Sequence, residues 1–441
     1  MPKDKLPTTI KSNLLRSIKQ HLERPNPDLS SDHSLSNEVL PKQKYKSPST
    51  IRSRLLRSVK KKLERKPTSL PNSRAAKKAK LTEHYGLPED SKFLFLKKGR
   101  KFGRPRLSLS HGTVVCLDVD TSELLLVVRF VERQEGINDE LFRSYNHSIS
   151  TVYQHAKARN EVLGNFATYR GRRQGNKFGR MYAAGFRPGY DHIVKGGHYT
   201  WNAEVANDLR KMEADLKRQG NLPAIESFFA ERFSSLSLFA FDSNATLAAQ
   251  TNAPSWGNQS FYVTPNSKVF GSSIVVTCDE FVNKKHKDRD ASKYAFGLFS
   301  LVNRATGELY HRGVNAPRGN NLGARFVLND YNVDVNHDAS DGVIEMLWNS
   351  QIHHHTIASK TFNKNHDRIP AESAEITRFG CSCQISQSLV DRLNTVKSLQ
   401  STMSEEDWLS YESSVFTGYK EQAHQKMKAL AIKYGIWQED F

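Results

Sequence analysis

The stretch Phe281-Val282-Asn283-Lys284-Lys285-His286-Lys287-Asp288-Arg289-Asp290-Ala291, near the middle of a chain of 441 residues, decides how this sequence is interpreted. Its centre carries a histidine and an aspartate at positions i and i+2. On an extended backbone such residues project to one face, so His286 and Asp288 can reach the same ion. Two histidines and one carboxylate on one face of a metal are typical of non-haem iron(II) sites, because they leave coordination positions open. The sequence therefore has to supply one later histidine.

Three consecutive histidines, His353-His354-His355, offer the missing ligand. They follow the apolar run Gly342 to Trp348, which predicts a buried strand. Strand alternation puts neighbouring histidines on opposite faces, so His354 and His355 are alternatives. A second polar group precedes the strand, and we interpret it as a solvated loop: Asp334, His337, Asp338 and Asp341.

A further strand is predicted to begin at Thr377-Arg378-Phe379-Gly380. One face of this strand would carry Arg378, Gly380, Ser382 and Gln384. The other would carry Phe379, Cys381, Cys383 and Ile385, which are apolar enough to pack. A guanidinium on the first face can hold a carboxylate through two parallel hydrogen bonds, and a glycine beside it leaves room for one.

The order H-x-D, histidine, arginine is that of 2-oxoglutarate-dependent dioxygenases, and four blocks of the chain resemble the fungal branch of the TET/JBP dioxygenases. The blocks are Leu109–Val115, Gly179–Arg187, Phe281–Ala291, and Gly342–Trp348 with the H-x-T and TRFG sequences behind it. They occur in the family's order between about residues 107 and 393. The resemblance implies an α+β protein with a double-stranded β-helix, or jelly-roll, core.

The same resemblance implies an enzyme that uses Fe(II), 2-oxoglutarate and O2 to oxidise 5-methylcytosine in DNA. It implies that His286, Asp288 and His354 hold the iron, because Thr356 keeps the place of the family's H-x-T threonine. Arg378 would grip the far carboxylate of 2-oxoglutarate. Arg180 is a weaker candidate for a cosubstrate or phosphate contact.

For the substrate, the resemblance implies that Asp290 and Asn283 contact the base. The alternative for Asp290 is a surface ion pair with Arg289 or Lys293. A methyl group on a paired base is shielded, so the base would be flipped or already unpaired. Two other functions stay open: a DNA-binding protein that keeps this fold without catalysis, and a dioxygenase acting on N6-methyladenine, thymine, RNA or protein.

Charge divides the chain into a basic arm and a neutral remainder. Residues 1–110 contain 28 Lys and Arg against 9 Asp and Glu, a balance of +19 that equals the formal charge of the whole chain. We expect residues 1–90 to be a largely disordered arm that binds a polyanion. Residues 91–106 would be a linker, 107–393 the dioxygenase domain, and 394–441 a helical tail.

Within the arm, Thr9–Arg24 recurs as Thr50–Arg65. The repeat predicts two basic amphipathic helices, at about 8–24 and 49–65, that could bind DNA, an acidic partner or a membrane surface, or remain solvated. The cluster Arg74–Lys80 suggests nuclear localisation.

The linker contains a Gly-Arg-Pro centre flanked by basic residues, which resembles an AT-hook. Arg100, Arg104 and Arg106 could enter a narrow A/T minor groove. The alternative is an ordinary linker into the first strand of the domain.

The remaining sequence predicts a hairpin from strands at 113–119 and 123–130, helices at 202–219, 223–233 and 389–399, and a capping box at Ser404–Asp407. Four cysteines in so long a chain do not make a disulfide framework. No apolar stretch approaches the ~20 residues that span a bilayer, so we expect a soluble intracellular protein without a membrane partner. Its oligomeric state is left open.

Overall fold

The computed structural model describes residues 74–99, 106–162, 179–188, 196–257, 269–279, 281–310, 324–357 and 375–407, together with 425–426, 429 and 432–433. The two repeated helices expected at 8–24 and 49–65 lie outside these residues, as do Arg100 and Arg104 of the AT-hook-like segment.

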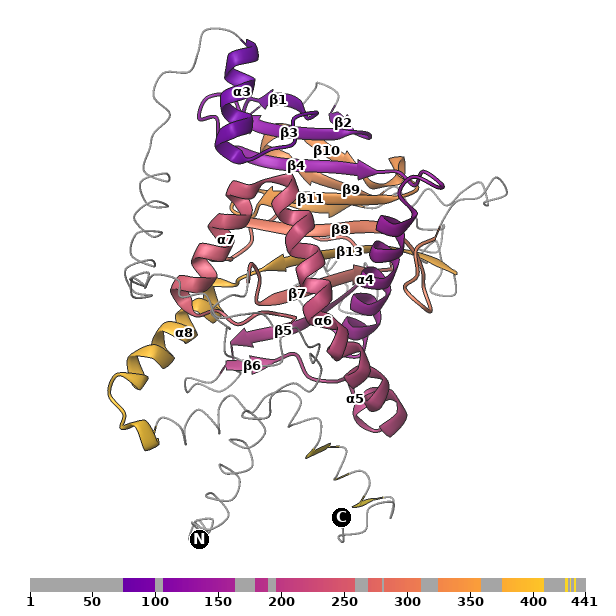
Figure 1. Ribbon diagram of the computed structural model, residues 1–441, viewed down its shortest axis with the longest axis vertical. Coiled ribbons are helices and arrows are strands. Elements are labelled where there is room, and N and C mark those ends of the chain that lie inside the picture. Colours follow the sequence, from indigo (N-terminus) through magenta and orange to yellow (C-terminus); the bar gives the residue numbers. More distant parts are fainter. Residues whose placement is uncertain are drawn as a thin grey trace, which may run out of the picture. The chain divides into compact units, whose positions relative to one another are not determined.

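Two β-sheets stacked face to face form the core of the described part (Figure 1). The larger has nine strands in the order β1-β3-β4-β11-β8-β13-β7-β5-β6, and the smaller has four in the order β12-β9-β10-β2. The strands of the large sheet are β1 (Lys92–Leu96), β3 (Thr113–Asp118), β4 (Leu124–Val131), β5 (Arg180–Pro188), β6 (Gly196–His198), β7 (Ser273–Cys278), β8 (Tyr294–Asn303), β11 (Val343–Asn349) and β13 (Ile376–Gln384). Those of the small sheet are β2 (Leu107–Leu109), β9 (Arg325–Leu328), β10 (Val333–Asn336) and β12 (His354–Ile357).

Helices cover the other face of the large sheet (Figure 1). The described helices are α3 (Arg74–Tyr85), α4 (Asp139–Lys157), α5 (Ala203–Ala206), α6 (Leu209–Leu236), α7 (Leu238–Thr251) and α8 (Gln387–Gln400), with short 3-10 turns η2 (Asn329–Tyr331) and η3 (His337–Ala339). This three-layer arrangement, with mostly antiparallel pairing, confirms the expected α+β class and is consistent with a jelly-roll oxygenase core.

Strand β11, in the interior of the large sheet, shows why a largely apolar run was needed. All seven of its residues are buried, because the sheet is covered on both faces. Val343 and Leu347 pack toward the helices, whereas Ile344, Met346 and Trp348 pack toward the small sheet. The predicted buried strand is confirmed.

The N-terminal boundary of the folded part differs from the expected one at residue 107. Helix α3 buries Leu81 and Tyr85 in the core, and β1 pairs with β3 in the large sheet. Two lysines of the cluster Arg74–Lys80 lie over aromatic rings: Lys77 Nζ is 4.5 Å from the ring centre of Phe95, and Lys78 Nζ is 5.3 Å from that of Phe93. A basic surface therefore concealed an apolar face that packs against distant residues.

Other local predictions have mixed outcomes. The hairpin forms as the antiparallel pair β3 and β4. The helices expected at 202–219 and 223–233 form the short helix α5 followed by one long helix, α6, that continues through Pro223. A proline inside a helix is costly, but Leu222, Ile225 and Phe229 flank it and are buried in the core. Helices α4 and α7 were not predicted.

Helix α8 confirms the predicted helix, and its Leu389 and Leu393 pack in a small hydrophobic cluster with Phe186 of β5 and Ala248 of α7. The capping interaction is present, because the backbone N–H of Asp407 donates to Ser404 Oγ at 3.2 Å. All four cysteines are buried and free. Among the helices that the structure describes, none is both long enough and apolar enough to span a bilayer.

A buried carboxylate ties the helices to the large sheet. Glu345 of β11 has no exposed surface, and its Oε2 lies 3.1 Å from Arg129 Nη1 of β4. Its Oε1 accepts hydrogen bonds at 2.5 Å from Tyr145 of α4 and from Arg232 of α6. Burying a charge is tolerated only when it is paired and hydrogen-bonded in this way.

We expect Glu345→Ala to lower the free energy of unfolding by about 3–5 kcal/mol, because Arg232 and Arg129 would then keep buried, uncompensated charge. Urea unfolding of both proteins measures the difference. The control is Glu231→Ala, which removes an exposed carboxylate from α6, the helix that carries Arg232. Equal stability of the Glu345 variant and the parent chain would contradict the role of this carboxylate.

Candidate functional site

Three side chains that are distant in sequence converge beside the small sheet. His286 and Asp288 lie between β7 and β8, and His354 begins β12. Asp288 Oδ1 lies 3.2 Å from His286 Nε2, and its Oδ2 lies 3.3 Å from His354 Nε2. One ligand atom from each of the three fits within 4.8 Å of the others, which is the spacing of a metal-binding group.

Backbone hydrogen bonds hold this arrangement. His286 and His354 form an antiparallel bridge, in which each backbone N–H donates to the other's carbonyl, at 3.0 and 2.9 Å. The N–H of Asp288 donates to the carbonyl of Ser350 at 3.0 Å. The segment carrying the first two ligands is thus fastened to the strand carrying the third.

The orientation of both imidazoles suits metal binding. His286 Nδ1 lies 2.7 Å from the carbonyl of Lys284, and His354 Nδ1 lies 2.9 Å from that of Ile352. A carbonyl only accepts, so each Nδ1 carries the proton and donates it. In the neutral rings this leaves the Nε2 lone pairs for a cation, the usual arrangement of metal-bound histidine.

The neighbouring histidines point elsewhere. His353 Nδ1 lies 2.9 Å from Asp330 Oδ2, and His355 Nδ1 lies 2.7 Å from Asn329 Oδ1. Burial, with the nearby charge of Arg106, lowers the pKa of His355 to about 4. Of the three consecutive histidines, only His354 joins the cluster, as the alternation of a strand requires.

The electrostatics of the cluster favour a divalent cation. Burial alone would raise the pKa of Asp288, but hydrogen bonds from His286 and His354 hold it well below its usual range. The hydrogen bond with Asp288 raises the pKa of His286. A bound metal would take the place of the protons that these groups share. The donor set of two imidazoles and one carboxylate, with a pocket in front of it, fits iron(II).

A cavity of about 380 Å³ adjoins the cluster. Its walls come from the large sheet, the small sheet and the segment that carries the ligands. The lining residues are Met181, Val275, Thr277, Phe281, Asn283, Lys284, His286, Asp288, Phe299, Phe326, Trp348, His354, Thr356, Gly380, Cys381, Ser382 and Gln384. Gly380, Ser382 and Gln384 face it as the sequence predicted, whereas Phe379 and Cys383 pack on the helix side.

Arg378 lies beside this cavity, next to Gly380 on the same face of β13. Its side chain is 6% exposed. Nη1 donates to the carbonyl of His337 at 2.9 Å, and Nη2 bonds the carboxylate of Asp338. The ring of His337 stacks on Phe299 at 4.5 Å, and Phe299 lines the cavity. These contacts fix the guanidinium close to the cavity wall.

The polar group before β11 was expected to be a solvated loop. This prediction holds for Asp341, which is exposed, and was wrong for Asp334, His337 and Asp338. Asp334 is 3% exposed and accepts hydrogen bonds from Ser108 Oγ at 2.7 Å and from Arg325 at 3.0 Å. His337 is 1% exposed, and burial and the charge of Arg378 hold its pKa well below the usual value. Their partners are remote in sequence, so composition alone could not reveal their burial.

The two residues expected to contact substrate lie at different depths. Asn283 lines the cavity, and its Oδ1 accepts from the backbone N–H of Thr356 at 2.6 Å. Asp290 is not among the lining residues. Its Oδ2 is buried without a hydrogen-bond partner among the described residues, and burial and the charge of Asp288 raise its pKa to about 8. No described ion pair joins it to a lysine or arginine, and Lys293 pairs with Glu123 instead.

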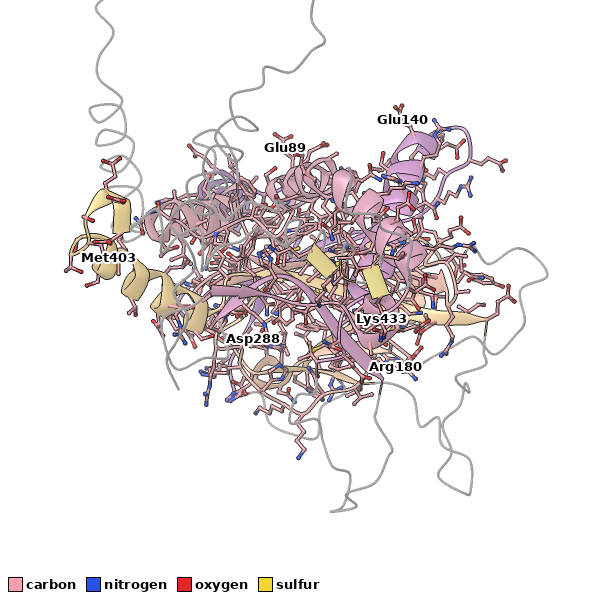
Figure 2. The ribbon with its side chains drawn as sticks, turned by 90° about the horizontal axis from the view of Figure 1, so that it is seen from below. Glu89, Glu140, Arg180, Asp288, Met403 and Lys433 are labelled. Atoms are coloured by element: carbon pink, nitrogen blue, oxygen red, sulfur yellow. The ribbon has the colours of Figure 1, made fainter. Side chains whose placement is uncertain are left out.

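Arg180, a candidate for a cosubstrate or phosphate contact, is not among the residues that line the cavity, and Arg106, predicted to contact DNA, pairs with an aspartate. Arg180 alternates with the lining residue Met181 on β5, and its Nε lies 3.4 Å from Asp279 Oδ2. Figure 2 shows Arg180 and Asp288 well apart. Arg106 lies 3.8 Å from Asp334.

Several lining residues were not predicted from the sequence. Phe326 and Trp348 flank His354, with ring centres 5.3 and 6.2 Å from the imidazole. Met181 and Phe281 complete the mouth from blocks that carried the resemblance. The only signal for Trp348 was its place at the end of a buried strand, and Phe326 had none.

Comparison with known families agrees with this geometry. The model of the Tet-like 2OG-Fe(II) oxygenase superfamily matches residues 143–359, a segment that includes His286, Asp288 and His354 and ends before Arg378. The match does not address the fungal branch. The search of curated proteins gave no match. Residues 143–359 of this chain therefore match the Tet-like 2OG-Fe(II) oxygenase superfamily, and this match implies an oxidoreductase that uses Fe(II), 2-oxoglutarate and O2.

Proposed function

We propose that this dioxygenase oxidises the methyl group of 5-methylcytosine in DNA to 5-hydroxymethylcytosine and further oxidised forms. The observation that carries the proposal is the Tet-like family match over the residues that form the metal-binding cluster. Iron bound there would activate O2, with 2-oxoglutarate consumed as the cosubstrate. Activated oxygen is needed to break the C–H bond of a methyl group. The protein's own residues have to place both reactants.

The cavity supports this assignment by its size and its walls. A volume of about 380 Å³ falls within the range of small-molecule sites. Phe281, Phe299 and Trp348 provide aromatic surface of the kind on which a flipped base packs. A base inside a duplex cannot reach the cluster, so the target nucleotide has to be extruded or unpaired.

Asn283 and Asp290 are proposed to read the edge of the base. Asn283 lines the cavity with its carbonyl oxygen held by Thr356, which leaves the amide N–H groups to donate. Asp290 lies behind the cavity wall, with a buried carboxyl oxygen that has no hydrogen-bond partner among the described residues. To accept from the amino group of cytosine, this carboxyl would have to turn toward the cavity.

Arg378 is proposed to bind the far carboxylate of 2-oxoglutarate. Asp338 and the carbonyl of His337 hold the guanidinium in one orientation, so little side-chain freedom is lost when an anion arrives. Gly380, on the same strand face, lines the cavity, and Thr277 and the ring of Phe299 pack closely against it. The basic arm is proposed to bind the nucleic acid, and nuclear localisation stays a prediction.

The substrate is tested by mass spectrometry of nucleosides after incubation of the full chain with methylated duplex, Fe(II) and 2-oxoglutarate. We expect 5-hydroxymethylcytosine to accumulate, with the Asp288→Ala variant as the inactive control. Parallel incubations contain N6-methyladenine in DNA, unmodified thymine and methylated RNA. Product from one of these and none from 5-methylcytosine would replace the proposed base.

The metal ligands are tested by separate replacement of His286 and Asp288 with alanine. Each variant should lose Fe(II) binding and drop 2-oxoglutarate decarboxylation to background, while the unfolding midpoint stays close to that of the parent, since neither side chain packs in the core. The matched control is His353→Ala, because His353 lies beside His354 but bonds Asp330. Decarboxylation that persists in either ligand variant would refute the assignment.

Arg378→Lys tests the cosubstrate site. An ammonium cannot reproduce a bidentate fork, and a lost hydrogen bond to a charged group costs about 1.5–3 kcal/mol, so the KM for 2-oxoglutarate should rise roughly 10- to 100-fold. Steady-state kinetics with varied 2-oxoglutarate measure it. Arg325→Lys, which alters an arginine bound to Asp334 in the small sheet, is the control. An unchanged KM in the Arg378 variant would move the carboxylate site elsewhere.

A further inference from the structure

The segment that carries the first two metal ligands has a second, outward face. From residue 285 to residue 290 exposure alternates strictly: Lys285, Lys287 and Arg289 are exposed, whereas His286, Asp288 and Asp290 are partly or largely covered. Successive side chains of an extended backbone point to opposite sides, so the ligands face inward and the cations outward. Lys284, which precedes the alternation, is also exposed and lines the mouth of the cavity.

Only some of the charges on this outward face are compensated by described residues. Lys285 Nζ lies 3.1 Å from Asp330 Oδ1, and the neighbouring Lys293 lies 2.7 Å from Glu123. For Lys284, Lys287 and Arg289, by contrast, the described residues provide no ion pair. The carboxylate of Asp288 faces the two histidines, and that of Asp290 is buried. Among the residues that the structure describes, three cations of this segment thus have no ion-pair partner, and one of them, Lys284, lines the cavity.

We propose that Lys284, Lys287 and Arg289 bind the phosphates that flank the target nucleotide. This inference rests on the proposed function, since it needs a nucleic acid as substrate. A nucleotide whose base occupies the cavity keeps its phosphates outside it. Lys284 lines the cavity, and Lys287 and Arg289 follow it on the exposed face of the same segment. Contacts to phosphates fix the position of a nucleic acid without reading its sequence.

The geometry gives this contact a positioning role as well as a binding role. Lys287 lies between the two ligands in the chain, and Arg289 follows the second. The backbone between them is fixed by the bridge to His354 and the hydrogen bond to Ser350. A phosphate held by these residues is thus held at a set distance from the metal-binding cluster, which is how a remote contact aligns a reacting group.

The test compares three full-length double variants with the parent chain. Lys287→Gln/Arg289→Gln removes two charges from the rim. Lys287→Arg/Arg289→Lys keeps both charges. Arg210→Gln/Lys217→Gln removes two exposed charges from α6, in the helical layer that covers the other face of the large sheet. Each is titrated with one duplex, methylated and unmethylated, at several salt concentrations, and Fe(II) binding is measured alongside.

Each phosphate contact contributes about 0.9 to the slope of log K against log salt on duplex DNA. For Lys287→Gln/Arg289→Gln, the rim-neutralised variant, we expect the slope to become shallower on both duplexes by the amount that one to two phosphate contacts contribute. This variant should also need more methylated duplex to reach its half-maximal rate. The charge-keeping and α6 variants should keep the parent slope. If the glutamine pair also weakens Fe(II) binding, the single variant Arg289→Gln, expected to lose one contact, replaces it.

An unchanged slope in the rim-neutralised variant, on a duplex that the chain binds and oxidises, would overturn the rim assignment and leave the proposed function standing. A flattened slope without oxidation of 5-methylcytosine would overturn the proposed base and support the rim contact. An equal loss of slope in the α6 variant would show that the effect is one of net charge, and would also overturn it.

Discussion

The pair of backbone hydrogen bonds between His286 and His354 is the interaction on which the functional geometry depends. His354 begins a strand of the small sheet, and the segment of His286 leads directly into β8 of the large one. The bridge therefore fixes the distance between the two sheets at the place where the metal ligands meet. Backbone hydrogen bonds do not depend on side-chain identity, so the site is organised before any metal arrives, and the imidazoles need only the carbonyls behind them for orientation.

The candidate site was largely predictable because its determinants are local. The H-x-D pattern places two ligands on one face by strand geometry alone. Strand alternation puts His354 and His355 on opposite faces, so only one of them can be the third ligand. The hydrogen bond of His355 to Asn329 identifies His354 as that ligand. The alternation of β13 likewise put Gly380 and Ser382 at the cavity. Patterns of this kind can be recognised from a few consecutive residues. The strand that ends near Trp348 was identified in the same way, from an apolar run bounded by polar residues.

What the sequence did not predict depends on partners far along the chain. Helix α3 carries a basic cluster, yet Leu81 and Tyr85 pack into the core that α7 and the large sheet complete. Pro223 suggested a break that burial of its neighbours overrides. Asp338 looked solvated until Arg378, forty positions away, bonded it. One practical consequence follows: a truncation meant to remove only the basic arm has to end before Arg74, since a cut at residue 106 would also remove α3 and β1.

Charge is distributed at two length scales. The formal excess of the chain resides in its first 110 residues, while the remainder is balanced. A balanced domain attracts a polyanion weakly over long distances, so an arm of high charge is the part that can raise the encounter rate. Near the cavity the balance breaks down locally, because the acidic side chains of the H-x-D segment are turned inward and its basic ones outward. The alternation that builds the metal-binding cluster thus also produces a cationic rim. The basic arm would then capture the nucleic acid, and the cationic rim would align one nucleotide with the cavity. A uniformly basic surface would bind the nucleic acid without favouring that alignment.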